Sequence, residues 1–178
     1  GWLEQLHNLR QRLDPQTAGK RGRATSFDVR DEVEDTFRLY ETILASQMVS
    51  FQIHSPDKPV RVRMARAALG QVLANLVDNA IFWLIRSKGS GQGGTIQARV
   101  EARSGGFTVT VSDDGPGVPD EVRYYFFEPY FTSKPNGFGL GLFFARLVIE
   151  PYGRLVYRED GPLPGACFEA VFERGVAL

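Results

Sequence analysis

The stretch Asp113-Asp-Gly-Pro-Gly-Val-Pro119 directly follows an apolar segment, Phe107-Thr-Val-Thr-Val-Ser112. The alternation in that segment predicts a β-strand, which places Asp113 at a strand end. The two glycines of the stretch let the backbone lie close against a flat ligand, because glycine has no Cβ atom. The Asp113 carboxylate can accept hydrogen bonds from an exocyclic amine. The same residues also suit an ordinary surface turn, so this stretch alone leaves both interpretations open.

The composition is that of an ordinary globular domain, with 178 residues of which 43% are hydrophobic. The 21 basic and 21 acidic residues give a net charge of zero, which argues against broad binding to nucleic acid or anionic lipid. A single cysteine, Cys167, excludes an internal disulfide framework and a cysteine-based zinc site. There is no signal peptide, and no apolar run approaches the ~18 residues of a membrane span. We therefore expect a cytoplasmic domain, whose parent protein can be membrane-anchored.

The N-terminal residues predict a helix with one narrow apolar face. Trp2, Leu6, Leu9 and Leu13 recur at helical spacing, and Pro15 ends the pattern. So short a helix is marginal alone, so we expect the tail of a longer helix that packs on a partner.

The rest of the chain alternates between strand and helix patterns. The expected strands are 25–29, 48–53, 60–64, 95–103, 107–112, 153–158 and 165–173, and the expected helices are 31–46, 65–87, 120–127 and 141–149. Several late strands are joined by short turns. This order predicts an α/β fold, a two-layer sandwich in which helices cover one face of a mixed, mostly antiparallel sheet.

The helix expected over 65–87 carries two asparagines, Asn75 and Asn79, on one face beside its apolar residues. Neutral amide oxygens suit a Mg²⁺ ion that already has phosphate ligands. Without further motifs, caps or bridges to neighbouring loops are the commoner use of such side chains.

Two more segments follow the Asp113 stretch. Residues 127–134, Phe-Glu-Pro-Tyr-Phe-Thr-Ser-Lys, contain aromatics that can anchor a loop and end in Lys134, which can reach a phosphate or simply be solvated. Gly137, Gly139 and Gly141 then lead into a helix, where backbone amides can cradle an anion.

In order and spacing, these four segments resemble the boxes of the nucleotide-binding superfamily that joins histidine kinases, type II topoisomerases, the large ATP-dependent chaperone and the mismatch-repair ATPases. The match extends over roughly residues 25–175. The resemblance implies ATP and Mg²⁺ as ligands, Asp113 as acceptor for the adenine amine, Asn79 as Mg²⁺ ligand and Asn75 as support for the phosphates. The implied nucleotide-binding residues are Asn75, Asn79, Asp113, Gly115, Gly117, Lys134, Gly137, Gly139, Leu140 and Gly141, of which Asn75 and Lys134 are the catalytic candidates. Asp114, at the variable position, is expected to be a turn residue.

Within the superfamily, Asn75 occupies a position where the hydrolysing branches usually carry a Glu that activates water. An amide cannot take a proton, so the chain is most similar to the catalytic ATP-binding domain of a sensor histidine kinase, a protein-histidine kinase of two-component signalling. The implied partners are a histidine-bearing dimerisation domain, a response regulator and a second copy of the full-length protein. His7 and His54 are interpreted as surface residues, so the acceptor histidine is expected outside this chain.

The resemblance divides the chain into the end of an upstream dimerisation helix (1–14), a linker (15–24) and the catalytic domain (25–178). Two positions depart from the family pattern, namely Phe82 where a Lys is frequent and Ala166 where a hydroxyl is frequent. Two alternatives therefore stay open: an ATP-gated conformational or dimerisation switch without kinase activity, and a regulatory domain that binds no nucleotide.

Overall fold

The computed structural model describes residue 4 and residues 22–131 and 141–174 of the chain. The helix expected over 1–13 and most of the 15–24 linker lie outside this described part. The helices are α2 (Val29–Ser46), α3 (Arg66–Lys88) and α4 (Gly141–Ile149), with a short 3₁₀ turn, η1 (Asp120–Val122). The strands are β1 (Ala24–Asp28), β2 (Val49–His54), β3 (Arg61–Ala65), β4 (Gly94–Arg103), β5 (Gly106–Asp113), β6 (Gly153–Tyr157) and β7 (Cys167–Phe172).

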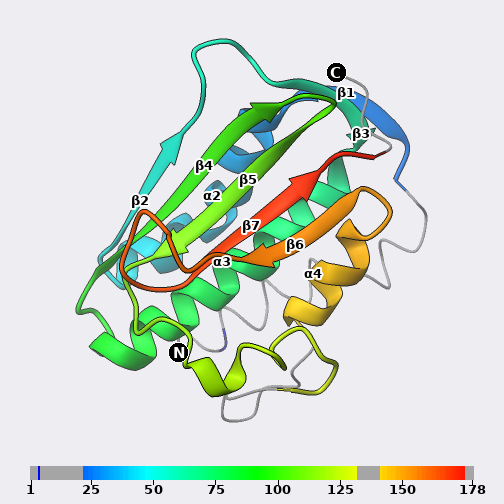
Figure 1. Cartoon of the computed structure of the whole chain (residues 1–178). Coiled ribbons are helices and arrows are strands. Elements are labelled where there is room, and N and C mark those ends of the chain that lie inside the picture. The colour runs from blue at the N-terminus through cyan, green and yellow to red at the C-terminus, as the bar shows by residue number, and fades with distance from the viewer. Residues whose placement is uncertain (1–3, 5–21, 132–140, 175–178) are drawn as a thin grey trace.

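Five strands form the main sheet, in the order β2-β4-β5-β7-β6, and α2, α3 and α4 lie on one of its faces (Figure 1). Only β2 and β4 pair in parallel; the other neighbours are antiparallel. The predicted two-layer α/β sandwich is therefore confirmed. Strands β1 and β3 form a separate antiparallel pair, a division that the sequence pattern did not indicate.

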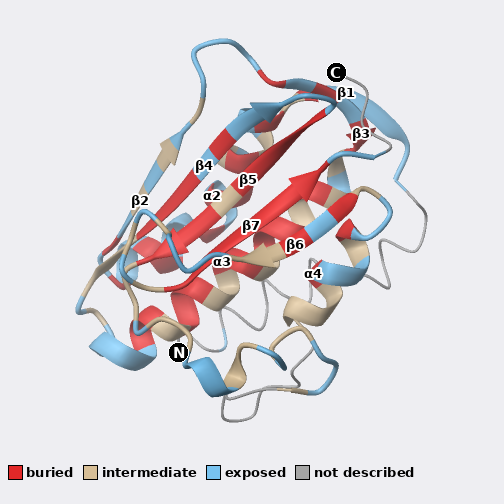
Figure 2. Ribbon diagram, in the orientation of Figure 1, coloured by how far each residue is buried: buried red, intermediate tan, exposed pale blue. Residues whose placement is uncertain are grey.

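Helix α3 is the centre of the core between the two layers. Its leucines at positions 69, 73 and 84 are fully buried, and Figure 2 shows the buried residues gathered between the sheet and the helices. By length and composition alone α3 could cross a membrane, contrary to the expectation that no segment comes near a span. However, 72% of its most apolar window is buried inside the domain, as befits a core helix.

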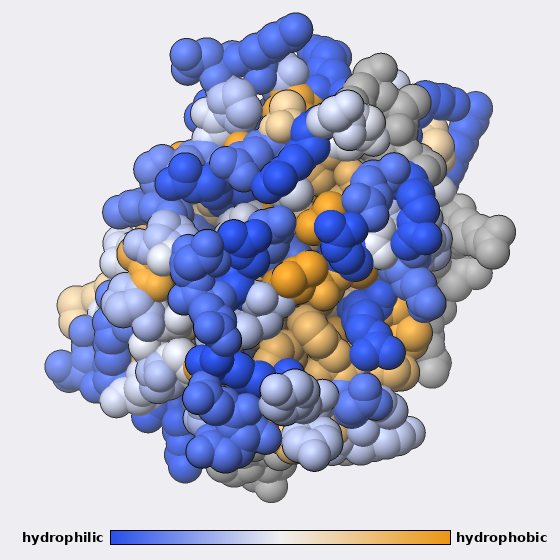
Figure 3. Space-filling view, viewed as in Figure 1, coloured by the Kyte–Doolittle hydropathy of each residue, from blue (hydrophilic) through white to orange (hydrophobic). Residues whose placement is uncertain are grey.

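The other face of the sheet is polar, because strand residues alternate between the two faces. Thr108 and Ser112 of β5 alternate with Val109 and Val111, which belong to the core. Figure 3 views the sheet from this side and shows a largely hydrophilic surface with some hydrophobic surface at its centre. The one-sided helical cover thus follows from the strand pattern.

One predicted element is wrong. Residues 120–127 form only the short turn η1 followed by further turns, not a helix. The cause is tertiary packing: the rings of Phe126 and Phe127 both pack against Phe168 of β7, with centroids 5.6 and 6.2 Å away. Tyr130, with φ of 62°, then turns the chain. The other predicted elements within the described residues agree with the structure to within two residues at each end.

Candidate ATP-binding site

Asp113 ends β5 and is buried, with 3% of its surface exposed. Its Oδ1 accepts hydrogen bonds from the backbone N–H groups of Gly115 (2.9 Å) and Ala166 (3.2 Å). Backbone bonds join the same segments: Asp113 N donates to the Ala166 carbonyl (3.0 Å) and Gly165 N to the Asp113 carbonyl (2.8 Å). The carboxylate is therefore fixed between its own loop and the start of β7, and Oδ2 makes no hydrogen bond to any described residue.

Burial raises the pKa of Asp113 from 3.8 to about 6, although the two backbone donors act in the opposite direction. The side chain is consequently ionised at neutral pH. A buried carboxylate with a free oxygen is a strong acceptor, because hydrogen bonds to charged groups are stronger than those between neutral groups.

Three glycines shape the surroundings of Asp113. A Cβ on Gly165 would overlap the carboxylate and carbonyl oxygens of Asp113, and a Cβ on Gly115 would lie 2.8 Å from Asp113 Oδ1. Gly117 adopts a φ of +74°, which disfavours other residues. Gly165 was absent from the sequence-based site. Its signal was its place directly before Ala166, in the segment compared with the family pattern, but no local pattern reveals that it contacts a residue 52 positions earlier.

Asp114 is more than the expected turn residue. Its Oδ1 accepts a hydrogen bond from Thr95 N (2.8 Å), and its Oδ2 forms an ion pair with Lys88 Nζ (2.8 Å). Its own N–H donates to the Thr95 carbonyl (3.2 Å). The sequence offered no signal for these contacts, because they join three separate elements.

The predicted loop lies against α3. The Gly115 Cβ position is 3.7 Å from the side chain of Leu84, a buried residue of α3. Asn75 and Asn79 of the same helix are half-buried. Asn75 Nδ2 donates to the Gln71 carbonyl of its own helix (2.9 Å). Neither amide bridges to a loop within the described residues, so the amide oxygens stay available for a ligand.

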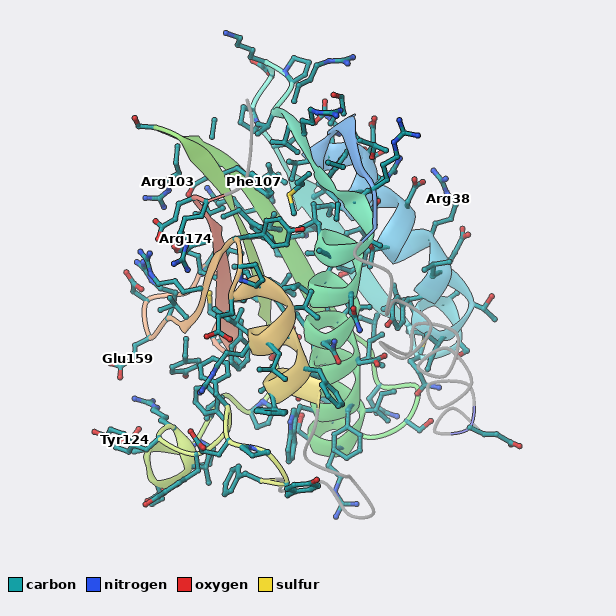
Figure 4. The ribbon with its side chains drawn as sticks, turned by 90° about the vertical axis from the view of Figure 1, so that its right-hand side faces the viewer. Arg38, Arg103, Phe107, Tyr124, Glu159 and Arg174 are labelled. Atoms are coloured by element: carbon teal, nitrogen blue, oxygen red, sulfur yellow. The ribbon has the colours of Figure 1, made fainter. Side chains whose placement is uncertain are left out.

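The segment after the loop is anchored on β6 and β7. The rings of Phe126 and Phe127 pack on Phe168, and Arg123 donates to the Val118 carbonyl (3.3 Å) and forms an ion pair with Glu159. Tyr124, in contrast, is 87% exposed and lies at the margin of the domain in Figure 4. Of the aromatics that the sequence proposed as a loop anchor, Phe127 packs in this way, whereas Tyr130 is largely exposed.

Helix α4 begins at Gly141 and lies beside α3 (Figures 1 and 4). The start of α4, η1 and the Asp113 loop all lie at the lower end of the view in Figure 1. The predicted residues Lys134, Gly137, Gly139 and Leu140 lie outside the described residues. Phe82 is buried, 8% exposed, and meets Trp83 edge to face, so this position contributes an apolar side chain to the core.

The geometry agrees with what comparison to known proteins finds. The family model described as histidine kinase-, DNA gyrase B- and HSP90-like ATPase matches residues 64–175, more than half of the chain. The chain belongs to this family. As the family is one of ATPases, ATP is the ligand of such a domain.

Curated relatives of this ATPase domain are sensor proteins. This chain is 34% identical over 134 residues to the C4-dicarboxylate transport sensor protein DctB of Rhizobium meliloti, and the match covers 75% of this chain. It is 39% identical over 116 residues to the sensor protein kinase PilS of Pseudomonas aeruginosa, covering 64% of this chain. In both cases the match spans only 21% of the relative's own length.

Solved structures give the same family. The catalytic domain of histidine kinase ThkA, in a nucleotide-free form, superposes with a TM-score of 0.72 at 28% identity, covering 85% of this chain and 95% of that one. A second ThkA structure, in complex with the response regulator protein TrrA, gives a TM-score of 0.66 at 26% identity and covers 85% of this chain and 42% of that one. The predicted family, fold and histidine-kinase branch are thus confirmed.

Proposed function

We propose that this domain binds Mg-ATP and donates the γ-phosphoryl group to a histidine of a separate dimerisation domain, as the catalytic part of a sensor histidine kinase. The observation that carries the proposal is the buried Asp113 carboxylate, with one oxygen fixed by two backbone donors and the other without a protein donor among the described residues. Such an acceptor selects an exocyclic amine, because an unpaired buried carboxylate is costly. The sensor-kinase relatives support the same function.

The roles of the other predicted residues follow from the groups that each presents to a ligand. Gly115 and Gly117 keep the wall beside the base free of side chains, and Asn75 supports the phosphates. Asn79 would hold Mg²⁺ through its amide oxygen, which fits the residues present: Asn79 is half-buried on α3 and its side chain makes no hydrogen bond to a described residue. When bound, Mg²⁺ supplies charge neutralisation for the phosphates.

The chemical step needs little from this domain beyond positioning. The bond between the γ-phosphorus and the oxygen of the leaving ADP breaks, a phosphorus–nitrogen bond forms, and the histidine ring gives up its proton. Asn75 cannot act as a base toward water, which disfavours hydrolysis as the main reaction. Lys134 and the glycines at 137, 139 and 141, with Leu140, would hold the phosphates from the lid side.

The surroundings of the domain belong to the same proposal. Residues 1–14 would end an upstream dimerisation helix and 15–24 would link it to the catalytic domain, 25–178. The full-length protein would act as a homodimer whose catalytic domain lies in the cytoplasm, with or without a membrane anchor elsewhere in the protein. It would pass its phosphoryl group to a response regulator. The complex of ThkA with TrrA supports a partner of that kind.

Calorimetric titration of the 178-residue chain with ATP and Mg²⁺ tests the nucleotide site. Asp113→Asn should weaken binding at least about tenfold, because an amide is a weaker acceptor than a carboxylate. Asp35→Asn, an exposed carboxylate on α2, is the matched control and should bind as the wild type does. Unchanged affinity in Asp113→Asn would overturn the assignment.

The phosphoryl acceptor is tested on the full-length protein with γ-labelled ATP. Acid-labile label on the protein is the result expected of a histidine kinase. Nucleotide-dependent dimerisation without any label would instead favour the ATP-gated switch, and a domain that binds no nucleotide would favour the regulatory alternative.

A further inference from the structure

Asp114 joins three elements that meet behind the Asp113 loop. Its two carboxylate oxygens contact Thr95 N at the start of β4 and Lys88 Nζ at the end of α3, both at 2.8 Å. Its backbone N–H donates to the Thr95 carbonyl (3.2 Å). Both oxygens of the side chain are therefore engaged by the protein.

These contacts reach the ligand-binding part of the loop through the chain itself. Asp113 and Gly115 flank Asp114, and the Gly115 N–H is one of the two donors that fix the Asp113 carboxylate. A shift of Asp114 would move Gly115 and loosen that bond. The ion pair with Lys88 is partly shielded, with 32% and 25% of the two side chains exposed, so it is less screened than an ordinary surface pair.

We propose that Asp114, together with Lys88, is the positioning residue of the Asp113–Gly117 loop and sets the pH range in which Asp113 accepts a nucleotide base. This inference rests on the proposed ATP site. The pair of opposite charges stands next to Asp113 and acts on it in opposite senses: Asp114 favours the protonated form of Asp113, and Lys88 favours the ionised form.

Few other charges compete with this pair. From β7 the titratable group near Asp113 is the Cys167 thiol, whose pKa burial raises to about 11, so it is neutral. From β4 the residue paired with Asp113 is Ile96, which carries no charge. The pKa of Asp114 itself is lowered despite some burial, chiefly by Lys88 and the Thr95 N–H, so it stays ionised.

The test uses the titration of Asp113 itself, followed by carboxyl ¹³C NMR in the nucleotide-free 178-residue chain from roughly pH 4 to 8. Asp114→Asn should move the midpoint to lower pH, because Lys88 then acts alone. Lys88→Met should move it to higher pH, because Asp114 then acts alone. The double variant should fall between the two, and Asp35→Asn should match the wild type. Identical midpoints, or shifts of both single variants in one direction, would overturn the electrostatic role.

Positioning is tested by affinity at pH 8, where Asp113 is ionised in every variant. Asp114→Ala should lose about tenfold in ATP affinity and speed amide exchange at Gly115, while Asp114→Asn, which keeps an acceptor for Thr95, should lose about threefold or less. Wild-type affinity in Asp114→Ala would refute the positioning role. Failure of the wild type to bind ATP would refute the proposed function instead, and the NMR midpoints and Gly115 exchange would still decide the role of Asp114.

Discussion

The two walls of the candidate site are built in different ways. On the side of Asp113, the hydrogen bonds of its carboxylate and backbone run to backbone groups of Gly115, Gly165 and Ala166, which join β5 to the start of β7. On the α3 wall, the only hydrogen bond of the two asparagines to a described residue runs from Asn75 to its own helix. The Asp113 side is thus held by bonds within the protein, whereas the amide oxygens on the α3 side would find their partners in the proposed ligand. In the proposed ATP site, a preorganised contact to the base would thus stand beside an adaptable contact to the phosphates.

The substitution with the largest expected effect is on the Asp113 side of the site. Gly165→Ala places a methyl group on the oxygens of Asp113, with no room to yield because backbone bonds hold both segments. We expect ATP affinity to fall by about a hundredfold and stability by about 1–3 kcal/mol. Calorimetry and denaturant unfolding measure both. Gly22→Ala, whose new Cβ meets only ordinary contacts at 3.7 and 3.8 Å, serves as the control.

Low pH should weaken ATP binding reversibly, because it protonates Asp113. With a pKa of about 6, Asp113 is about one-tenth ionised at pH 5, so ATP should bind about tenfold more weakly there than at pH 8. The effect on stability has the opposite sign. The folded state holds the proton more tightly than the unfolded state, so this group adds stability as pH falls from 6 toward 4. In Asp113→Asn both trends should disappear, and any pH dependence left there belongs to ATP.

Asn79→Ala addresses the open wall. Affinity for ATP should fall about tenfold in the presence of Mg²⁺ and change little in its absence, since the lost amide oxygen serves the ion. Equal loss under both conditions would show that Asn79 contacts the nucleotide directly. Unfolding free energy should stay near that of the wild type, because the Asn79 side chain makes no hydrogen bond to a described residue.

The smallest expected effect is that of Asn75→Ala. The Asn75 amide already donates one hydrogen bond to the Gln71 carbonyl, within the same helix. We expect ATP affinity to fall about threefold or less, because a single neutral hydrogen bond to phosphate contributes about 1 kcal/mol or less. A loss as large as that of Gly165→Ala would erase the proposed contrast between the walls.

Local patterns predicted most of this fold. The helical spacing of the apolar residues in α3 and the alternation in β4 and β5 identified those elements almost to the residue. They succeeded because burial on one side repeats with the period of each element. The prediction of a helix over 120–127 failed because its four consecutive aromatics, Tyr124 to Phe127, show no such period. Contacts of Phe126 and Phe127 with β7 decide the conformation instead.

The motif residues of the proposed site could be selected from the sequence, but the contacts that support them could not. Asp113 and its two glycines were visible because they are neighbours in the chain. The contacts of Gly165 with Asp113 and those of Asp114 were not visible, since they depend on segments that only the folded domain brings together. Four predicted residues of the lid, Lys134 among them, lie outside the described residues and stay predictions.

The position of β7 has a consequence for how the domain is made. It is the last strand of the described residues, yet it lies inside the sheet between β5 and β6, and all six of its residues are buried. During synthesis the sheet therefore stays incomplete, with one edge of β5 unpaired, until β7 has left the ribosome. The donor that fixes Asp113 from Ala166 arrives at the same moment. A chain truncated before β7 would accordingly lack the donor that fixes Asp113, so the proposed nucleotide site forms only after β7 has joined the sheet.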